Sequence, residues 1–291
     1  MNSYFDRVVK PCIREYLEVI PGKKGIGGLF GLALNLLKPG SVCYPNVTVV
    51  ITTRCSLKCA KCNNLMPMYK EPYHINADEV IADVNTLLKY SDCCMKLSFL
   101  GGEPFIYPEL HKIIDAFRDH PKVRCVEFVT NATVIPEESL LKKIAGMKNP
   151  LISISDYGVK TQKTEELKNK LSEAGIPCNT DKAVSWVDPG GTEKRGKDIK
   201  TLEKEYDNCY SSRYCRTLQN GKIYTCSRAA SLCDLGFMDD SHDSLDLRKD
   251  RTEAEFRKEM RDFLTIAYAD ACDHCDHAKG IKIPAGEQLN G

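Results

Sequence analysis

Strand-like and helix-like stretches alternate along the first two thirds of the chain. Runs rich in apolar and β-branched residues predict strands at 47–53, 96–100, 124–130 and 151–155, and a weaker one at 177–183. Amphipathic stretches between them predict helices at 77–90, 108–120, 136–147 and 161–174. Because a helix between two parallel strands makes a right-handed crossover, this alternation predicts an α/β fold with a parallel sheet, open or barrel-like.

The alternation stops near Trp186, and the remaining third of the chain has a different pattern. Residues 187–198 are rich in glycine and charge, which indicates a linker or an active-site loop. Residues 218–226 predict a hairpin with Asn-Gly at its turn, and a helix is expected around 253–264. We therefore expect an N-terminal helical segment over 1–45, a parallel α/β domain over 46–190 and a small hairpin–helix domain over 191–291.

The charge and the targeting signals exclude several classes of partner. Charged residues make up 28% of the 291 residues and the net charge is +1, so no global field recruits nucleic acid or an anionic membrane. The apolar stretch 25–37 is too short to span a bilayer and predicts a packed or interfacial helix. No signal, transit or lipidation motif is found, so we expect a cytoplasmic protein without a transmembrane span.

The chain contains fifteen cysteines, which is unusual for a reducing compartment. Structural disulfides are rare there, which leaves metal ligation, catalysis or burial as the reasons for the thiols. Six cysteines lie in or beside apolar segments, where we expect them to be small buried hydrophobic residues: Cys12, Cys43, Cys93, Cys94, Cys125 and Cys178.

Three further cysteines follow the first predicted strand within eight residues, in the stretch "RCSLKCAKC". A structural zinc site needs four ligands, so Cys55, Cys59 and Cys62 are one short. A cubane iron–sulfur cluster can take three thiolates and leave one iron open to another ligand. Just past the end of a strand, that iron would face the crevice where α/β proteins bind small molecules.

The spacing Cys55-x3-Cys59-x2-Cys62, followed by "GGEP" after the second strand, resembles the signature of the radical S-adenosylmethionine (SAM) superfamily. This resemblance implies a partial (β/α) barrel that binds a [4Fe–4S] cluster and SAM. In that family an electron from the reduced cluster cleaves SAM to methionine and a 5′-deoxyadenosyl radical, which abstracts a hydrogen atom from the substrate. A reductant of the flavodoxin or ferredoxin type is then the expected protein partner.

The resemblance also assigns residues to the binding of SAM. In the GGEP turn, backbone carbonyls and the Glu103 carboxylate can accept hydrogen bonds from an ammonium group. Small polar residues after the third and fourth strands correspond to positions that contact the methionine and ribose of SAM. Relatives usually have an aromatic residue just before the third cysteine, whereas this chain has Lys61. The expected SAM-binding residues are Gly101, Gly102, Glu103, Pro104, Thr130, Asn131, Ser153, Ser155 and Asp156.

The cysteines near the C-terminus resemble the auxiliary-cluster extensions called Twitch and SPASM. The pattern Cys209-x11-Gly-x4-Cys226 is completed by Cys272-x2-Cys275, which predicts one auxiliary [4Fe–4S] cluster. Cys215 lies inside the same motif, and we expect it to be either a cluster ligand or a catalytic thiol that donates a hydrogen atom. A zinc knuckle is the alternative, and it would draw on nearby histidines: His242, His274 and His277.

The compact layout resembles that of 2-deoxy-scyllo-inosamine dehydrogenases. It implies an enzyme that oxidises or epimerises an unactivated C–H position of a small polar substrate, such as a sugar or an aminocyclitol. Three alternatives stay open at this point: a radical SAM maturase or epimerase of a ribosomal peptide, a non-catalytic zinc-binding module, and an electron carrier with two clusters.

Overall fold

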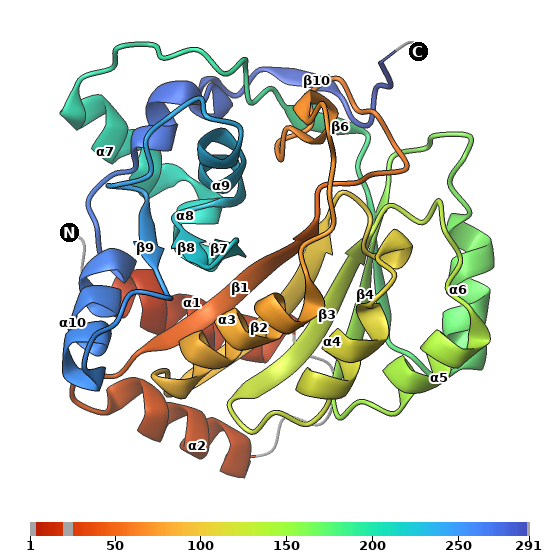
Figure 1. Cartoon of the computed structure of the whole chain (residues 1–291), viewed down its shortest axis with the longest axis horizontal. Coiled ribbons are helices and arrows are strands. Elements are labelled where there is room, and N and C mark those ends of the chain that lie inside the picture. The colour runs from red at the N-terminus through yellow and green to blue at the C-terminus, as the bar shows by residue number, and fades with distance from the viewer. Residues whose placement is uncertain (1–3, 20–25, 290–291) are drawn as a thin grey trace.

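The computed structural model describes residues 4–19 and 26–289, and its centre is an eight-stranded sheet with the order β5-β4-β3-β2-β1-β7-β8-β9 (Figure 1). Strands β1 to β5 run parallel in chain order, and β7 lies parallel to β1 on its other side. The parallel strands are β1 (Cys43–Thr52), β2 (Cys93–Gly101), β3 (Val123–Thr130), β4 (Pro150–Asp156), β5 (Cys178–Lys182) and β7 (Cys215–Gln219). Each strand expected in the first two thirds of the chain is therefore present.

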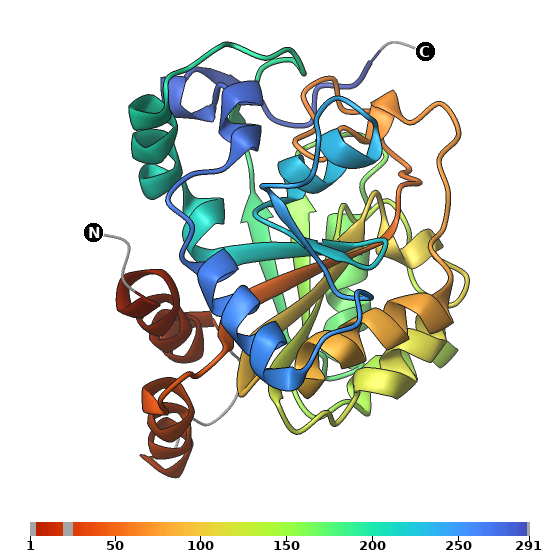
Figure 2. The ribbon, with the colours of Figure 1, turned by 60° about the vertical axis from the view of Figure 1, so that its left-hand side comes forward.

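Four helices connect the parallel strands and cover one face of the sheet (Figures 1 and 2). They lie within three residues of the expected bounds at α3 (Ala77–Lys89), α4 (Leu110–Phe117), α5 (Glu138–Ala145) and α6 (Thr164–Glu173). Asn76 begins α3 because its side chain accepts the backbone N–H groups of Asp78 and Glu79. Two short 3₁₀ turns follow the first two strands, η3 (Met66–Met68) and η4 (Pro104–Ile106).

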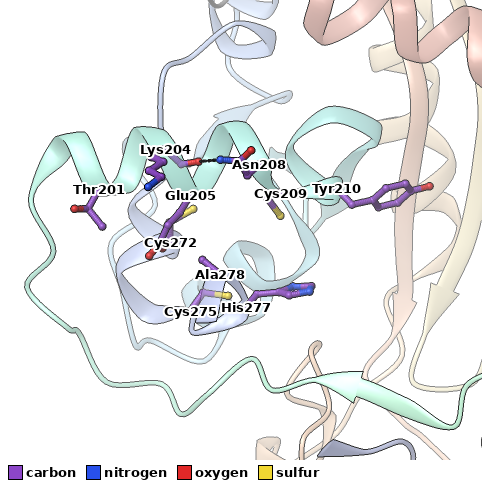
Figure 3. Close-up of a pocket in the computed structure, with 10 residues that line it drawn as sticks. All are labelled: Thr201, Lys204, Glu205, Asn208, Cys209, Tyr210, Cys272, Cys275, His277 and Ala278. Atoms are coloured by element: carbon purple, nitrogen blue, oxygen red, sulfur yellow. Dashed lines mark hydrogen bonds between the residues drawn. The ribbon is translucent and has the colours of Figure 1, made fainter. Parts of the chain in front are cut away.

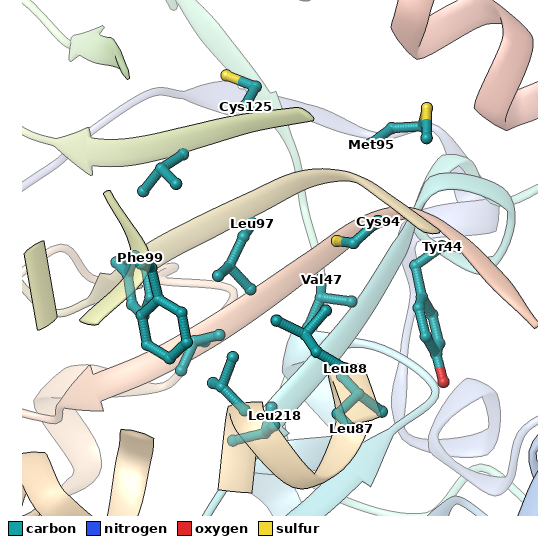
Figure 4. Close-up of a cluster of buried hydrophobic side chains, with 14 of the residues drawn as sticks. Tyr44, Val47, Leu87, Leu88, Cys94, Met95, Leu97, Phe99, Cys125 and Leu218 are labelled. Carbon is teal, nitrogen blue, oxygen red and sulfur yellow. The ribbon is translucent and has the colours of Figure 1, made fainter. Parts of the chain in front are cut away.

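The face under these helices carries the hydrophobic core (Figure 4). Val47 of β1, Leu97 of β2 and Leu87 of α3 are all fully buried there. The Phe99 ring stacks on Phe117 and Phe128, with centroids 5.7 and 5.8 Å apart. Of the six cysteines expected to be buried, five are, whereas Cys178 is partly exposed on the edge strand β5.

Because side chains alternate along a strand, the opposite face of the sheet carries a second set of residues, and many of these are polar. On this face, Asn46 of β1 is paired with Cys215 of β7 on one side and with Lys96 of β2 on the other. Two residues further along β1, Thr48 is paired in the same way with Thr217 and Ser98. The N-terminal segment packs against this region through η1 (Phe5–Val9), α1 (Lys10–Arg14) and η2 (Glu15–Val19).

The expected hairpin is formed by β7 and β8 (Lys222–Tyr224), and β9 (Ser244–Asp246) pairs with β8. Asn220 and Gly221 at its turn both have positive φ, at 49° and 78°, as a tight hairpin turn requires. The hairpin does not form a sheet of its own, because β7 pairs with the other edge of β1 and extends the main sheet. The expected three-part division of the chain stays a prediction, and the sheet runs across its second boundary.

The remaining elements surround the two ends of the sheet. Helices α7 (Ile199–Asn208), α8 (Tyr210–Tyr214) and α9 (Ser227–Asp234) lie together at the upper left of Figure 1, near the 3₁₀ turns η5 (Asp270–His274) and η6 (His277–Lys279). Helix α10 (Glu253–Leu264) begins with a capping box between Thr252 and Glu255. A second, two-stranded sheet pairs β6 (Ser185–Val187) with β10 (Lys282–Pro284).

The apolar stretch near the N-terminus forms α2 (Ile26–Leu37), and the first residue of the expected range lies outside the described residues. Leu32 and Leu36 of this helix pack into the core. In the part of the chain that the structure describes, no helix is long and apolar enough to cross a membrane.

Candidate functional site

Three of the predicted ligands lie on the loop that follows β1. Cys59 is buried on this loop, and Cys55 and Cys62 are partly exposed. Burial raises the pKa of all three thiols, that of Cys55 to about 12. The backbone N–H of Leu57 points at the Cys55 sulfur across 3.4 Å, and backbone N–H groups near residue 65 favour the thiolate of Cys62. A metal ion would have to supply the charge that deprotonates these buried thiols.

The glycines of the GGEP turn let β2 approach the cysteine loop. A Cβ atom on Gly101 would lie 2.0 Å from the Thr52 carbonyl oxygen. One on Gly102 would lie 2.0 Å from the Arg54 carbonyl oxygen and 2.6 Å from the Cys55 Cβ atom. The turn is therefore packed directly against the residue that carries the first thiol, which only glycine permits. Pro104 then begins the short turn η4.

Glu103 is fully buried behind this turn. Its carboxylate accepts hydrogen bonds from Thr130 Oγ1 (2.8 Å), from the backbone N–H of Asn131 (2.8 Å) and from that of Phe105 (3.0 Å). Burial raises its pKa to about 7, and these hydrogen bonds limit the rise. The carboxylate thus holds the turn after β3 in place, while its expected contact with an ammonium group stays a prediction.

Asn131 connects the turn after β3 to the cysteine loop. Its side-chain Nδ2 donates to Ser56 Oγ at 3.1 Å and lies 3.6 Å from the Cys55 sulfur. Its Oδ1 accepts the backbone N–H of Thr133 at 3.0 Å. The loops that follow β1, β2 and β3 therefore meet around Cys55, and each brings at least one of the predicted residues.

Gln162, which sequence reasoning missed, joins the loop after β4 to this group. Its Nε2 donates to the carbonyl oxygens of Asn131 (2.7 Å) and Ser155 (2.8 Å), and its Oε1 accepts the Tyr157 backbone N–H at 2.9 Å. A single glutamine before a helix gives no sequence signal for such a contact. The Asp156 side chain accepts the Gly158 N–H at 3.0 Å, so it is used within its own turn.

Ser153 belongs to a different group, a buried polar cluster on the sheet face opposite the hydrophobic core. Its Oγ donates to Glu127 at 2.6 Å, and the Lys96 ammonium lies 3.3 Å from the same carboxylate. Ser98 Oγ is within hydrogen-bond distance of both Glu127 and Asn46. From the N-terminal segment, the Glu15 carboxylate lies 3.7 Å from Lys96, and burial raises its pKa.

Cys215 lies at the end of this polar cluster. Asn46 Nδ2 lies 3.8 Å from its sulfur, across the pairing of β1 with β7. Burial raises the pKa of Cys215 to about 11, and the positive charge of Lys96 opposes the rise. The structure therefore places Cys215 beside charged groups of the sheet.

Three of the other C-terminal cysteines line one cavity of about 700 Å³ between α7 and the turns η5 and η6 (Figure 3). Cys209, Cys272 and Cys275 line it, together with His277. Cys226 caps α9, with its sulfur 3.4 Å from the Ala229 N–H. Its pKa is raised to about 12 by burial, and the nearby thiols of Cys209 and Cys275 add to the rise.

Lys197 supports the Cys-x2-Cys turn at this cavity. Its ammonium donates to the carbonyl oxygens of Cys272 (2.8 Å) and Cys275 (2.7 Å) and to the Glu205 carboxylate (2.8 Å). Four of the five predicted C-terminal ligands thus lie near one another. The fifth, Cys215, lies beside Asn46 and Lys96.

The spacing of the sulfurs bears on which metal these groups suit. A tetrahedral zinc site, with Zn–S bonds of ~2.3 Å, holds its sulfurs roughly 4 Å apart. Within residues 4–19 and 26–289, no three cysteine sulfurs lie within 4.8 Å of one another. In the same described ranges, the one group of potential ligands that meets this limit is His242, Asp243 and Asp270. The buried Asp243 carboxylate of this group accepts the backbone N–H groups of Asp270 and Ala271.

The region that carries these loops is similar to known proteins. Residues 49–180 match the model of the Radical SAM superfamily. GTP 3′,8-cyclase of Clostridium acetobutylicum is 31% identical over 108 residues, which cover 36% of this chain and 33% of that protein. GTP 3′,8-cyclase of Campylobacter lari is 25% identical over 133 residues, 44% of this chain and 38% of that protein. The chain thus spans about a third of the length of the curated relatives it matches.

The fold is shared with a solved structure described as "Native anSMEcpe with bound AdoMet". The TM-score is 0.52 at 16% identity, and the alignment covers 84% of this chain and 93% of the other. The expected fold class, a partial α/β barrel of the radical SAM type, is confirmed. The match to this superfamily in turn implies a [4Fe–4S] cluster and SAM as cofactors. Residues 49–180 of this chain are therefore similar in sequence to the radical SAM superfamily.

Proposed function

We propose that this chain uses SAM to abstract a hydrogen atom from an unactivated C–H position of a small polar substrate, a sugar or an aminocyclitol, leading to oxidation or epimerisation. Cys55, Cys59 and Cys62 would hold the [4Fe–4S] cluster. When bound, that cluster would supply the electron that cleaves SAM, and the protein would bind, orient and shield the reactants. A flavodoxin or ferredoxin would deliver the electron to the chain.

The observation that carries this proposal is the convergence of three strand ends on Cys55. Gly102 packs the turn after β2 against this residue, and Asn131 brings the turn after β3 to the same thiol. Polar backbone and side-chain groups from three loops thus surround one cysteine at the edge of a parallel sheet, where α/β proteins bind their ligands. Gly101, Thr130, Ser155 and Asp156 lie at the ends of β2, β3 and β4, and Pro104 lies on the turn after β2. All five are retained as proposed contacts of SAM.

The polar face of the sheet supports a substrate with several hydroxyl or amino groups. Lys96, Glu127 and Ser98 are nearly buried there, yet all belong to strands whose ends carry the proposed SAM site. A face that only packed against other elements would gain from apolar residues at these positions, because burying charge is costly. Charged and amide groups are the kind that recognise a polar substrate.

We further propose that Cys209, Cys226, Cys272 and Cys275 hold one auxiliary [4Fe–4S] cluster. The four thiols lie in one region, and three of them line the same cavity. No three of their sulfurs lie within 4.8 Å of one another, as the sulfurs of a zinc site would. A cubane carries its thiolates on separate irons and so accepts wider spacing between the sulfurs. Cys215 would then be left as a free thiol on the polar face.

Cleavage of SAM by the reconstituted protein tests the proposed function. Anaerobic protein with dithionite and SAM should release 5′-deoxyadenosine. The combined replacement Cys55→Ala, Cys59→Ala and Cys62→Ala should abolish this release and leave the C-terminal iron bound. Cys233→Ala is the matched control, because this thiol belongs to neither proposed ligand set and its sulfur faces the Asp239 carbonyl. Cleavage that survives the triple replacement would show that the reaction uses another site.

The substrate class requires a second measurement. A panel of deuterated sugars and aminocyclitols, with a set of cysteine-containing peptides in parallel, should show transfer of deuterium into 5′-deoxyadenosine for a member of the first group. Transfer from the peptides alone would replace the small-molecule proposal with peptide modification. The production of zinc-loaded protein without iron would support the non-catalytic module instead.

A further inference from the structure

Residues 286–289 lie along the cysteine loop, more than 220 positions away in the sequence. The Ala60 N–H donates to the Glu287 carbonyl, and the Leu289 N–H donates to the Lys58 carbonyl, both at 2.7 Å. Cys59 and Gln288 are the partners of this antiparallel bridge. The second thiol of the radical SAM motif is therefore held between two backbone hydrogen bonds from a distant segment.

The Gln288 side chain turns towards the thiol that its backbone faces. Its Oε1 accepts the Lys58 backbone N–H at 2.8 Å, and its Nε2 lies 3.2 Å from the Cys59 sulfur. The same Nε2 donates to the Gly286 carbonyl at 2.6 Å. If the amide were reversed, two N–H donors would face each other at Lys58, so this network determines its orientation. One N–H of Gln288 is therefore directed at sulfur.

The segment is also held in place by contacts that do not involve the cysteines. Gly286 has φ of +66°, and a Cβ atom there would lie 2.5 Å from the Tyr157 Cβ atom. The Tyr157 ring packs edge-on against Trp186, with centroids 5.0 Å apart. Because Trp186 lies on β6, which pairs with β10 just before the segment, the approach of Gln288 to Cys59 is fixed by the surrounding fold.

We propose that the Gln288 side chain donates a hydrogen bond to the Cys59 thiolate when the radical SAM cluster is bound, and that this bond raises the reduction potential of the cluster. This inference rests on the proposed ligand role of Cys59. The reduced cluster carries one more negative charge than the oxidised one, so a donor at a ligand sulfur stabilises the reduced form more. A group that donates a hydrogen bond to a metal ligand also orients that ligand. Gln288 is thus a positioning residue that acts through Cys59.

The test measures the reduction potential of the cluster in the reconstituted 291-residue chain. The potential is followed by electron paramagnetic resonance, on the signal that changes when SAM is added. Gln288→Leu removes the donor, and we expect a more negative midpoint, with the reduced-to-oxidised ratio at a fixed potential falling about tenfold, or about 59 mV for one electron. Gln288→Glu keeps the acceptor for Lys58 but places an anionic oxygen at the sulfur, so its shift should be larger. Leu289→Ala, on the same segment with an exposed side chain, should leave the midpoint unchanged.

A second measurement needs no substitution. Protein labelled with ¹⁵N in the glutamine side chain should show magnetic coupling between that nitrogen and the reduced cluster, and Gln288→Leu should remove this coupling. A wild-type spectrum without it, or a midpoint in Gln288→Leu equal to that of wild type, overturns the inference. If the Cys55, Cys59 and Cys62 triple replacement keeps the SAM-sensitive signal, the proposed function fails instead, so the two failures are distinguishable.

Discussion

The backbone N–H of Asn131 donates to the carboxylate of Glu103 across 2.8 Å, which joins the turn after β3 to the turn after β2. Asn131 in turn reaches Cys55 and Ser56 on the loop after β1. A buried carboxylate with no exposed surface thus orders the edge of the sheet where SAM is proposed to bind.

Glu103 should make the free energy of unfolding fall as the pH rises from about 4.5 to about 7. Its pKa rises from 4.5 to about 7 in the folded chain because burial disfavours the carboxylate. The folded state then binds the proton more tightly than the unfolded state, so this contribution to stability is present below about pH 4.5 and is lost as the pH rises through about 7. At ~1.4 kcal/mol per unit of pKa, the loss is at most about 3 kcal/mol.

Urea unfolding of the apoprotein from pH 4.5 to 8 checks this dependence, with Glu103→Gln as the reference. Subtracting the two unfolding free energies cancels the titration of the other carboxyl groups. The difference should fall with rising pH, by up to about 3 kcal/mol. A difference that is flat, or that rises with pH, would contradict the assignment.

Gly102→Ala should separate the turn after β2 from the cysteine loop. The added Cβ would meet the Arg54 carbonyl at 2.0 Å and Cys55 at 2.6 Å, so the backbone has to move. We expect a loss of roughly 1–3 kcal/mol of unfolding free energy, and less iron retained at this loop. Gly31→Ala on α2 is the control, because nothing lies within 4 Å of its Cβ, and it should stabilise by about 0.5–1 kcal/mol. Equal effects of the two substitutions would show that the contact at Gly102 is unimportant.

Lys96 and Glu127 should be strongly coupled, because both side chains are at least nine-tenths buried and their charges lie 3.3 Å apart. Removing one partner leaves the other charge buried, so Lys96→Met should cost about 3–5 kcal/mol. Adding Glu127→Gln should recover part of that cost in a double-mutant cycle followed by chemical unfolding. The exposed pair Lys143–Asp115 is the matched control, and its coupling should be about 0.2–1 kcal/mol. Additive costs for the buried pair would mean that the ion pair is not formed.

Iron content should distinguish Cys215 from the four thiols at the cavity. Cys272→Ala removes a proposed ligand and should lower the iron by about four atoms per chain, one whole cubane. Cys215→Ala should keep the full iron content, because this thiol lies beside Asn46 and the charge of Lys96 on the polar face of the sheet. Iron and sulfide per chain after anaerobic reconstitution provide the comparison. A deficit of about four irons in Cys215→Ala would restore it to the ligand set.

The sequence by itself determined the parallel α/β order and the three-cysteine loop. Alternating strands and helices are local patterns of burial, and a short loop such as that of Cys55 to Cys62 keeps its ligands close wherever the chain folds. The Asn-Gly turn was likewise predictable, because two successive residues with positive φ demand those residue types. Each of these features depends on neighbours in the chain.

The tertiary structure alone decided the contacts between distant segments. From the spacing of the cysteines, Cys215 could be a cluster ligand as well as Cys209. The pairing of β7 with β1 places Cys215 on the polar face of the sheet, beside Lys96. Gln162 and Gln288 have no motif around them, since an amide becomes specific only when backbone groups from other loops fix both of its ends. Local periodicity carries no information on such pairings, because they arise from how the sheet edge and the later segments pack together.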